Sequence, residues 1–345
     1  MRLDELLVVP IVGAPMAGGP TTAALAAAVS DAGGLGFLAA GYKTPDAVKD
    51  EIAAVRAVTR KPFGVNLFFP TRDPADEEAL TRYARALQVE EERYGVRCGE
   101  PIWNDDEWEG KLALVARERP AAVSFTFGCP DREVVEWLKD LGISVWATVT
   151  SVGESQRAVS SGVSALVVQG AEAGGHQGSY LSPNDEPLSV LALLQQIAPR
   201  TDLPLIAAGG IAGAAGLVAV LAAGATAAQI GTALMLSPEA GTSDPHREAL
   251  RGERGTRLTR AFSGRRARGI VNRFMVEHGK DAPTAYPQVH YLTAPLRARA
   301  RELDDSDGVN LWAGQSYRLA EEAPAAELVE RWATRASAVK DRQRL

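Results

Sequence analysis

The residue best suited to chemistry is a histidine flanked by glycines. Residues 171–178 read Ala-Glu-Ala-Gly-Gly-His-Gln-Gly, directly after an apolar run at 165–168, and His176 is one of 4 histidines among 345 residues. Glycine lets a backbone approach a ligand closely, and loops at strand ends commonly carry catalytic side chains. We therefore expect His176 to be catalytic and Gly174 and Gly175 to lie against a ligand. The alternative is a histidine bonded only to the backbone of its own loop.

Two later glycine-containing turns suit a phosphate group. The apolar run at 204–208 ends in Gly209 and Gly210, and the run at 227–230 ends in Gly231 and Thr232. Glycines at such junctions let backbone N–H groups and a helix N-terminus meet a phosphate without a side chain between them. Ordinary tight turns between strand and helix are the alternative.

The first strand-like run ends in Gly-Ala-Pro-Met-Ala-Gly-Gly at 13–19, with no Gly-x-Gly-x-x-Gly fingerprint. Pro15, Met16 and their small neighbours indicate a rigid loop over which a flat ring could lie. A plain strand-to-helix turn capped by Thr21 or Thr22 explains the segment equally well.

Three amide side chains, those of Asn66, Gln169 and Gln229, interrupt apolar strands. A buried amide needs partners for both its oxygen and its nitrogen, so three of them at strand ends indicate a ligand rich in heteroatoms. Hydrogen bonds to neighbouring loops would also satisfy them.

These residues must be positioned by a repeating framework of strands and helices. Short β-branched runs alternate with helix-like segments, as in a parallel sheet covered by crossover helices. Eight strands favour a closed (β/α)8 TIM barrel over an open doubly wound sheet. We expect them near residues 8–13, 35–39, 63–68, 122–127, 144–148, 165–169, 204–208 and 227–234.

Two insertions are too long for ordinary connections. We expect residues 1–72, 120–240 and 305–345 to form the cofactor-binding barrel, and residues 73–119 and 241–304 to form a mainly helical cap and substrate subdomain. Both insertions follow strands at their carboxyl ends, which places the cap over the catalytic mouth. A helix at 325–339 would close the barrel or pack against it.

Other polar residues carry weaker signals. Arg265, Arg266 and Arg268 could hold a substrate carboxylate, because a guanidinium binds that group through two parallel hydrogen bonds. Arginines on a polar face are more often solvated or paired within the protein, and that is the expectation here.

The remaining histidines and the cysteines suggest no further site. His246, His278 and His290 lack a recognisable ligand spacing, so no metal site is expected. Cys129 has no histidine close in sequence, and we expect a small buried residue there instead of a nucleophile.

Composition excludes several classes of partner. The 43 acidic and 37 basic residues give a net charge of -6, and no basic block is dense enough for nucleic acid. Glycines break the most apolar window, around 214–236, so no membrane span is expected. Two cysteines without a metal or disulfide pattern, and no leader-like N-terminus, fit a cytoplasmic protein. The sequence leaves the oligomeric state undetermined, and a homodimer is one option.

Several of these segments together resemble the nitronate monooxygenases, formerly called 2-nitropropane dioxygenases, of the class I-like type. They are residues 10–19 (PIVGAPMAGG), 64–67 (GVNL), 169–176 (QGAEAGGH), 207–211 (AAGGI) and 229–232 (QIGT), in that order. Residues 263–272 (SGRRARGIVN) and 312–315 (WAGQ) are similar to later motifs of that family. The likeness therefore covers nearly the whole chain, and the segment ending in His176 is its most specific part.

The resemblance implies an FMN-dependent TIM barrel that oxidises alkyl nitronates, typically propionate 3-nitronate, with dioxygen and without nicotinamide. It places Met16 and Asn66 along the isoalloxazine and Gln169 on the flavin's polar groups. His176 would bind the nitro oxygens, or accept the α-proton of a neutral nitroalkane. The phosphate would be held by Gly209, Gly210, Gly231 and Thr232, and further cofactor contacts would come from Pro15, Gly174, Gly175, Gln229 and Gln315.

Two other functions remain open at this point. Barrels with the same motifs can act as NAD(P)H:quinone reductases or as flavin-dependent enoyl-acyl-carrier-protein reductases, although no nicotinamide site is evident in the sequence. A phosphate-binding barrel without a redox cofactor is the remote alternative.

Overall fold

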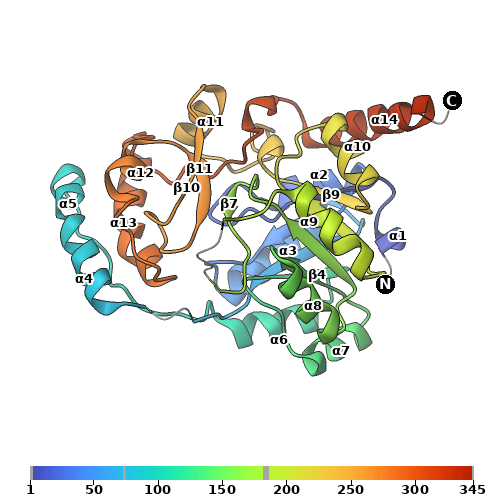
Figure 1. The fold of residues 1–345 in the computed structure, drawn as a ribbon, viewed down its shortest axis with the longest axis horizontal. Coiled ribbons are helices and arrows are strands. Elements are labelled where there is room, and N and C mark those ends of the chain that lie inside the picture. The colour runs from blue at the N-terminus through green and yellow to red at the C-terminus, as the bar shows by residue number, and fades with distance from the viewer. Residues whose placement is uncertain (1–2, 73–74, 182–185, 344–345) are drawn as a thin grey trace.

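Eight parallel strands form a nearly closed barrel in the computed structural model, which describes residues 3–72, 75–181 and 186–343 (Figure 1). Their order is β1-β9-β8-β6-β5-β4-β3-β2, and a bridge between Val12 and Leu35 brings the first and last together. The expected (β/α)8 TIM barrel is confirmed. The strands are β1 (Ile11–Gly13), β2 (Gly36–Ala39), β3 (Phe63–Phe68), β4 (Ala122–Thr126), β5 (Ser144–Val149), β6 (Ala165–Gln169), β8 (Leu205–Ala208) and β9 (Ala227–Ile230).

Alternating side chains of each strand fill two different layers. In β6, Leu166 and Val168 pack with the surrounding helices, whereas Val167 points into the barrel. There it joins Trp146, whose indole ring lies 5.0 Å from the ring of Phe37. Burial on both faces explains why the strands read as continuous apolar runs in the sequence.

The last barrel strand is shorter than its sequence predicts. The expected strand over 227–234 ends at Ile230, and the 3-10 helix η2 (Thr232–Leu234) follows. Gly231 lies in the right-handed helical region, with φ -115° and ψ -79°, which ends the extended backbone there. The prediction was therefore wrong for residues 231–234, whereas β3 and β6 begin and end as predicted.

Helices cover the outside of the barrel. They are α2 (Ala23–Asp31), α3 (Pro45–Val58), α6 (Trp108–Glu118), α7 (Arg132–Asp140), α8 (Val152–Ser161), α9 (Val190–Ile197) with η1 (Ala198–Arg200), α10 (Ala214–Ala222) and α14 (Ala325–Gln343), while α1 (Leu3–Leu6) adds its leucines to the barrel interior. Hydroxyl caps begin several of them, as Thr44 does for α3 and Ser189 for α9. Helix α14 packs against α2 and α10. Helix α6 lies within the insertion at 73–119 but packs on α3 and β3.

A second layer stands beside the barrel mouth (Figure 1). It contains α4 (Glu77–Ala86), α5 (Gln88–Tyr94), α11 (Asp244–Arg251), β10 (Thr256–Thr259), β11 (Ala267–Ile270), α12 (Arg273–His278) and α13 (Gln288–Glu302). Helix α5 packs against α13, and a separate apolar core joins them. This layer, called the cap below, also contains strands where the sequence was read as helices. Among the described residues, no helix is long and apolar enough to cross a membrane.

Candidate active site

A cavity of about 390 Å³ opens where the barrel strands end, and the cap closes one side of it. Ligand sites in barrels lie at this end of the strands, and the volume is within the usual range for small-molecule sites. The cavity brings together nearly all the residues expected from the sequence to form a site: Pro15, Met16, Asn66, Gln169, Gly174, Gly175, His176, Gly209, Gly210, Gln229, Gly231 and Thr232. Gln315 is the exception, because its side chain is exposed while its neighbours Gly314 and Ser316 line the cavity.

His176 lies on a short strand that joins the barrel to the cap. Strand β7 (Gly175–His176) pairs with β11, with His176 opposite Ala267. The Gln169 side chain braces this strand, because its Nε2 donates to the His176 carbonyl at 3.1 Å and its Oε1 accepts from the Gly178 N–H at 2.6 Å. Gln169 thus makes the loop hydrogen bonds that the sequence left open as an alternative to ligand contact.

The imidazole of His176 sits in an aromatic setting with one polar neighbour. Its Nε2 lies 2.8 Å from the Ser263 hydroxyl, and the rings of Trp312, Tyr286 and Phe127 surround it at 5.5 to 5.9 Å. Burial, together with the nearby charges of Arg265 and Arg297, lowers the pKa of His176 to about 3. The imidazole is therefore neutral at neutral pH and has one N–H to donate.

The two other strand amides retain unused hydrogen-bonding capacity. Asn66 Nδ2 donates to the Ser124 carbonyl at 3.1 Å and to two hydroxyls, those of Ser124 and Thr126. A carbonyl only accepts, so this side of the amide is the NH₂ group and the oxygen remains for a donor in the cavity. Gln229 also lines the cavity, and its side chain has no hydrogen bond within the described part of the chain.

A side chain on the glycines of the turns after β8 and β9 would be strained or crowded. A Cβ on Gly209, whose φ is +109°, would lie 2.8 Å from the Ala173 nitrogen, and Gly210 also has a positive φ of +71°. A Cβ on Gly231 would lie 3.2 Å from Ala14 Cβ. The turns line the cavity with backbone, which suits an anion held by N–H groups.

The loop after β1 is both a capped strand-to-helix turn and part of the cavity lining, the two roles that its sequence suggested. Thr22 caps α2 by accepting from the Leu25 N–H, and the Thr21 hydroxyl accepts from the Met16 N–H at 2.8 Å. Pro15 and Met16 meanwhile line the cavity. The capped turn therefore fixes the backbone that faces the ligand space.

The arginines that attracted attention in the sequence do not line this cavity. Arg268 Nε donates to the Ala171 carbonyl at 2.7 Å, which anchors the loop before His176. Arg265 is buried with its guanidinium 4.3 Å from the ring centre of Phe127, and the Arg266 carbonyl accepts from the backbone of Gln177. Their ordered positions fit the structural role that was expected of them, although Arg265 and Arg268 are buried instead of solvated.

The sequence analysis missed one face of α13. His290, Ala294, Arg297 and Arg301 line the cavity at successive helical turns. Their spacing of four, three and four residues was a detectable signal for one helix face. The sequence offered no reason to examine this face, because α13 lies in the cap, far along the chain from every barrel strand.

Tyr42 was also missed, and it connects this face to the barrel. Its ring stacks on His290 with centroids 4.0 Å apart, and its hydroxyl lies 3.0 Å from that of Tyr286. The Tyr42 N–H donates to Asp106, which is partly buried and forms an ion pair with the buried Lys111 at 2.8 Å. Tyr42 has φ 65°, a conformation that non-glycine residues rarely adopt and that these contacts hold.

The other histidines and Cys129 have protein partners. His246 Nε2 lies 3.1 Å from the Trp312 carbonyl, and burial lowers the pKa of His246 to about 4. Cys129 is a free cysteine, and burial raises the pKa of its thiol to about 11. A thiol of this kind is a poor nucleophile.

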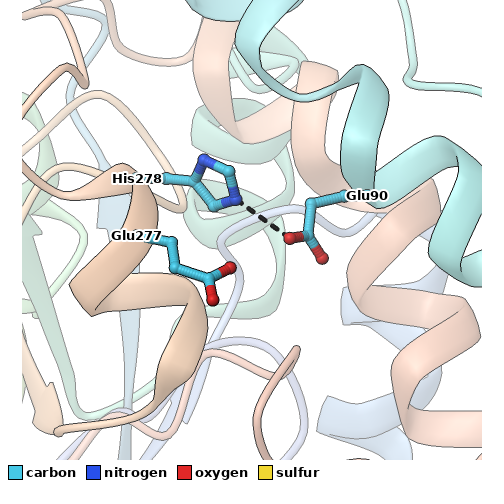
Figure 2. A group of neighbouring side chains, drawn as sticks. All are labelled: Glu90, Glu277 and His278. Atoms are coloured by element: carbon cyan, nitrogen blue, oxygen red, sulfur yellow. Dashed lines mark hydrogen bonds and ion pairs between the residues drawn. The ribbon is translucent and has the colours of Figure 1, made fainter.

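Glu90, Glu277 and His278 place ligand-type atoms within 4.8 Å of one another in the cap (Figure 2). The guanidinium of Arg273 already occupies this group, donating to both oxygens of Glu90 at 2.6 and 2.8 Å and to Glu277 at 2.6 Å. His278 Nε2 lies 3.0 Å from Glu90. The arrangement ties α5 to α12, with a guanidinium where a metal ion would have to bind.

Comparisons with known proteins identify the family. The model of the nitronate monooxygenase family matches residues 1–334. The chain belongs to the nitronate monooxygenase family. It is 41% identical to the nitronate monooxygenase of Pseudomonas aeruginosa over 333 residues, which cover 93% of this chain and 94% of that protein. Membership makes the chain an oxidoreductase that oxidises nitronates.

Solved structures agree with this membership. A nitroalkane oxidase from Streptomyces ansochromogenes superposes with a TM-score of 0.96 at 45% identity and 99% coverage of both chains. FabK from Thermotoga maritima is more remote, with a TM-score of 0.77 at 26% identity over 99% of this chain and 97% of that one. The more distant likeness does not favour the reductase alternatives over nitronate oxidation.

Proposed function

We propose that this nitronate monooxygenase family member binds FMN in the cavity and uses dioxygen to oxidise a nitronate held beside His176. The observation that carries the proposal is the composition of the cavity. Glycine turns line it after β8 and β9, the side-chain oxygen of Asn66 and the amide of Gln229 are available to a ligand, and His176 lines the same space from β7. A flavin mononucleotide combines a phosphate with a flat ring rich in heteroatoms, which these groups suit.

Each group has a defined task in this proposal. Gly209, Gly210, Gly231 and Thr232 would hold the phosphate, and Met16, Asn66 and Gln229 would contact the ring system. FMN would supply the electron transfer to dioxygen. The neutral imidazole of His176 would donate its N–H to a nitro oxygen of the anionic substrate, oriented by Ser263. A second use of His176, accepting the α-proton of a neutral nitroalkane, needs the same neutral form.

An absorption spectrum followed by oxygen uptake tests the proposal. The purified protein, incubated with FMN and freed of excess, should show bound flavin and consume dioxygen when given propionate 3-nitronate. Protein that stays colourless would exclude FMN binding. Rapid anaerobic bleaching of the flavin by NADH, without nitronate turnover, would favour a reductase.

The role of His176 has its own variant. His176→Asn keeps a hydrogen-bonding group and should retain FMN, while nitronate turnover falls by about 10²-fold or more. Gln315→Ala is the control, because Gln315 is exposed and its truncation should leave the cavity unchanged. An unchanged rate in His176→Asn would remove His176 from the mechanism.

A further inference from the structure

One face of α13 brings two cationic side chains to the cavity. Arg297 and Arg301 both line it, one helical turn apart, and Arg297 is only 6% exposed. Among the described residues that line the cavity there is no aspartate or glutamate. The two guanidiniums therefore share a partly enclosed space without a carboxylate to neutralise them.

The hydrogen bonds of Arg297 all go to neutral groups. Its Nη2 donates to the His290 carbonyl at 2.8 Å and to His290 Nδ1 at 3.3 Å. Its Nε donates to Thr293 at 3.1 Å, and its Nη1 donates to the Asn310 side-chain oxygen at 3.3 Å. These bonds fix the guanidinium in place but leave its charge uncompensated.

Arg301 has even fewer partners. Within the described part of the chain it forms no ion pair and no hydrogen bond through its side chain, although burial is enough to lower its pKa. Burial and the like charge of Arg301 together lower the pKa of Arg297 to about 10. Two like charges brought together out of water are unfavourable unless an anion joins them.

We propose that Arg297 and Arg301 form a subsite for an anionic oxygen group, the carboxylate of a nitronate substrate. This inference rests on the proposed nitronate chemistry at His176. His176, Arg297 and Arg301 line the same cavity, so one substrate could present its nitronate to His176 and a carboxylate to α13. A guanidinium pair suits a carboxylate in geometry as well as in charge.

A phosphate presents the same chemistry, and FMN would carry one. The glycine turns after β8 and β9 offer the phosphate a backbone site without using α13. The experiment must nevertheless separate the two sources, so flavin retention is measured together with substrate kinetics.

The test compares two nitronates that differ in one group. Propionate 3-nitronate carries a carboxylate where propyl 1-nitronate carries a methyl group. Arg301→Met should raise the KM for propionate 3-nitronate by about 10- to 100-fold. It should leave the KM for propyl 1-nitronate within about twofold, kcat for both within about twofold, and FMN content unchanged. Arg297→Met should act in the same direction, and Arg297→Lys should recover part of the loss.

A matched control lies on the same helix. Arg299 is two residues from each of these arginines, has a side chain that is 40% exposed, and pairs with Glu302 at 2.9 Å. Arg299→Met should leave both KM values unchanged. Equal losses for the two nitronates in Arg301→Met, or no loss for propionate 3-nitronate, would overturn the subsite. Loss of FMN would assign the arginines to the phosphate and overturn it as well.

A binding measurement separates this proposal from the proposed function. Succinate resembles propionate 3-nitronate, with a second carboxylate in place of the nitronate. Calorimetry should show succinate binding to the FMN-loaded wild type, weakened about tenfold or more in Arg301→Met. If the wild type oxidises neither nitronate but still shows this difference, the proposed function fails and the anion subsite stands. If it oxidises both nitronates and succinate binding does not depend on Arg301, only the subsite fails.

Discussion

An arginine in the cap and two arginines at the cavity, all at least partly buried, have opposite surroundings. In the cap, Arg273 donates to both oxygens of Glu90 and also to Glu277. At the cavity, Arg297 and Arg301 face no carboxylate among the described lining residues. The arginine that ties α5 to α12 is therefore neutralised by carboxylates. The two arginines that a ligand in the cavity can reach have no carboxylate beside them among the described lining residues, and we interpret that difference as one between a structural charge and a binding charge.

The pKa values of these side chains also differ between the cap group and the cavity. Burial alone would raise the pKa of Glu90, but His278 and Arg273 together lower it to about 2. Burial opposes the charge of Arg273, yet its hydrogen bonds to Glu90 and Glu277 raise its pKa above the usual value. Arg297 experiences burial and the repulsion of Arg301, and its pKa falls to about 10.

The largest expected effect comes from breaking the paired group. Arg273→Met leaves the Glu90 carboxylate fully buried with only His278 and the more distant Arg93 beside it. Removing one partner of a buried ion pair typically destabilises by about 3–5 kcal/mol. Urea denaturation should show a loss of this size in the free energy of unfolding, while the KM for propionate 3-nitronate stays unchanged.

The outer partner of the same group provides the control. The Glu277 side chain is 44% exposed, so Glu277→Gln should lower the free energy of unfolding by less than about 1 kcal/mol. If Arg273→Met were no more destabilising than Glu277→Gln, the ion pair between Arg273 and Glu90 would not stabilise the cap.

A smaller effect concerns the two histidines that accompany these arginines. His278 faces a carboxylate, whereas His290 Nδ1 accepts from the guanidinium of Arg297 and must be unprotonated to do so. Burial lowers the pKa of His290 to about 2, and Arg297 adds to the shift. Because the folded pKa lies below the unfolded value of about 6.5, the stability from neutral His290 is present above that pH and is lost as the pH falls.

The measurement is the free energy of unfolding at pH 7 and at pH 5. Between pH 7 and pH 5, protonation of His290 should lower the free energy of unfolding of the wild type by about 2 kcal/mol. His290→Gln keeps an acceptor but cannot be protonated, so its free energy of unfolding should fall by about 2 kcal/mol less than that of the wild type. An equal pH dependence in both proteins would contradict a neutral His290 in the folded state.

The sequence predicted the barrel and most of the barrel residues that line the candidate site. Strand runs such as 165–169 are apolar on both faces, and turns such as Gly209-Gly210 follow them directly, so local pattern was sufficient. His176 was found because its glycines mark it in the linear sequence. Its pairing with β11 was not foreseeable, since β7 has only two residues and obtains its partner from a segment some 90 residues away.

The cap's contribution could not be located in the same way. Tyr42, His290 and Arg297 come together through stacking and a helix face, and their meeting depends on how the cap packs against the barrel. Sequence separation hides such contacts, because no single local period covers residues from both layers. The arginines closest to a recognised motif, Arg265 and Arg268, were considered instead, and they hold the loop and the aromatic layer.

The smallest expected effect comes from giving Arg297 a carboxylate partner, as Arg273 has in the cap. Asn310→Asp would place a carboxylate where an amide oxygen now lies 3.3 Å from Arg297 Nη1. Since Arg297 is already buried, only the new carboxylate must be desolvated, and the free energy of unfolding should rise by about 1 kcal/mol. The same carboxylate should compete with that of the substrate and raise the KM for propionate 3-nitronate about tenfold, with propyl 1-nitronate nearly unaffected. Asn310→Ser, which removes the amide without adding charge, is the control for both measurements. An aspartate variant that is destabilised and keeps its KM would mean that Arg297 has no need of an anion, and the contrast with Arg273 would then lose its functional meaning.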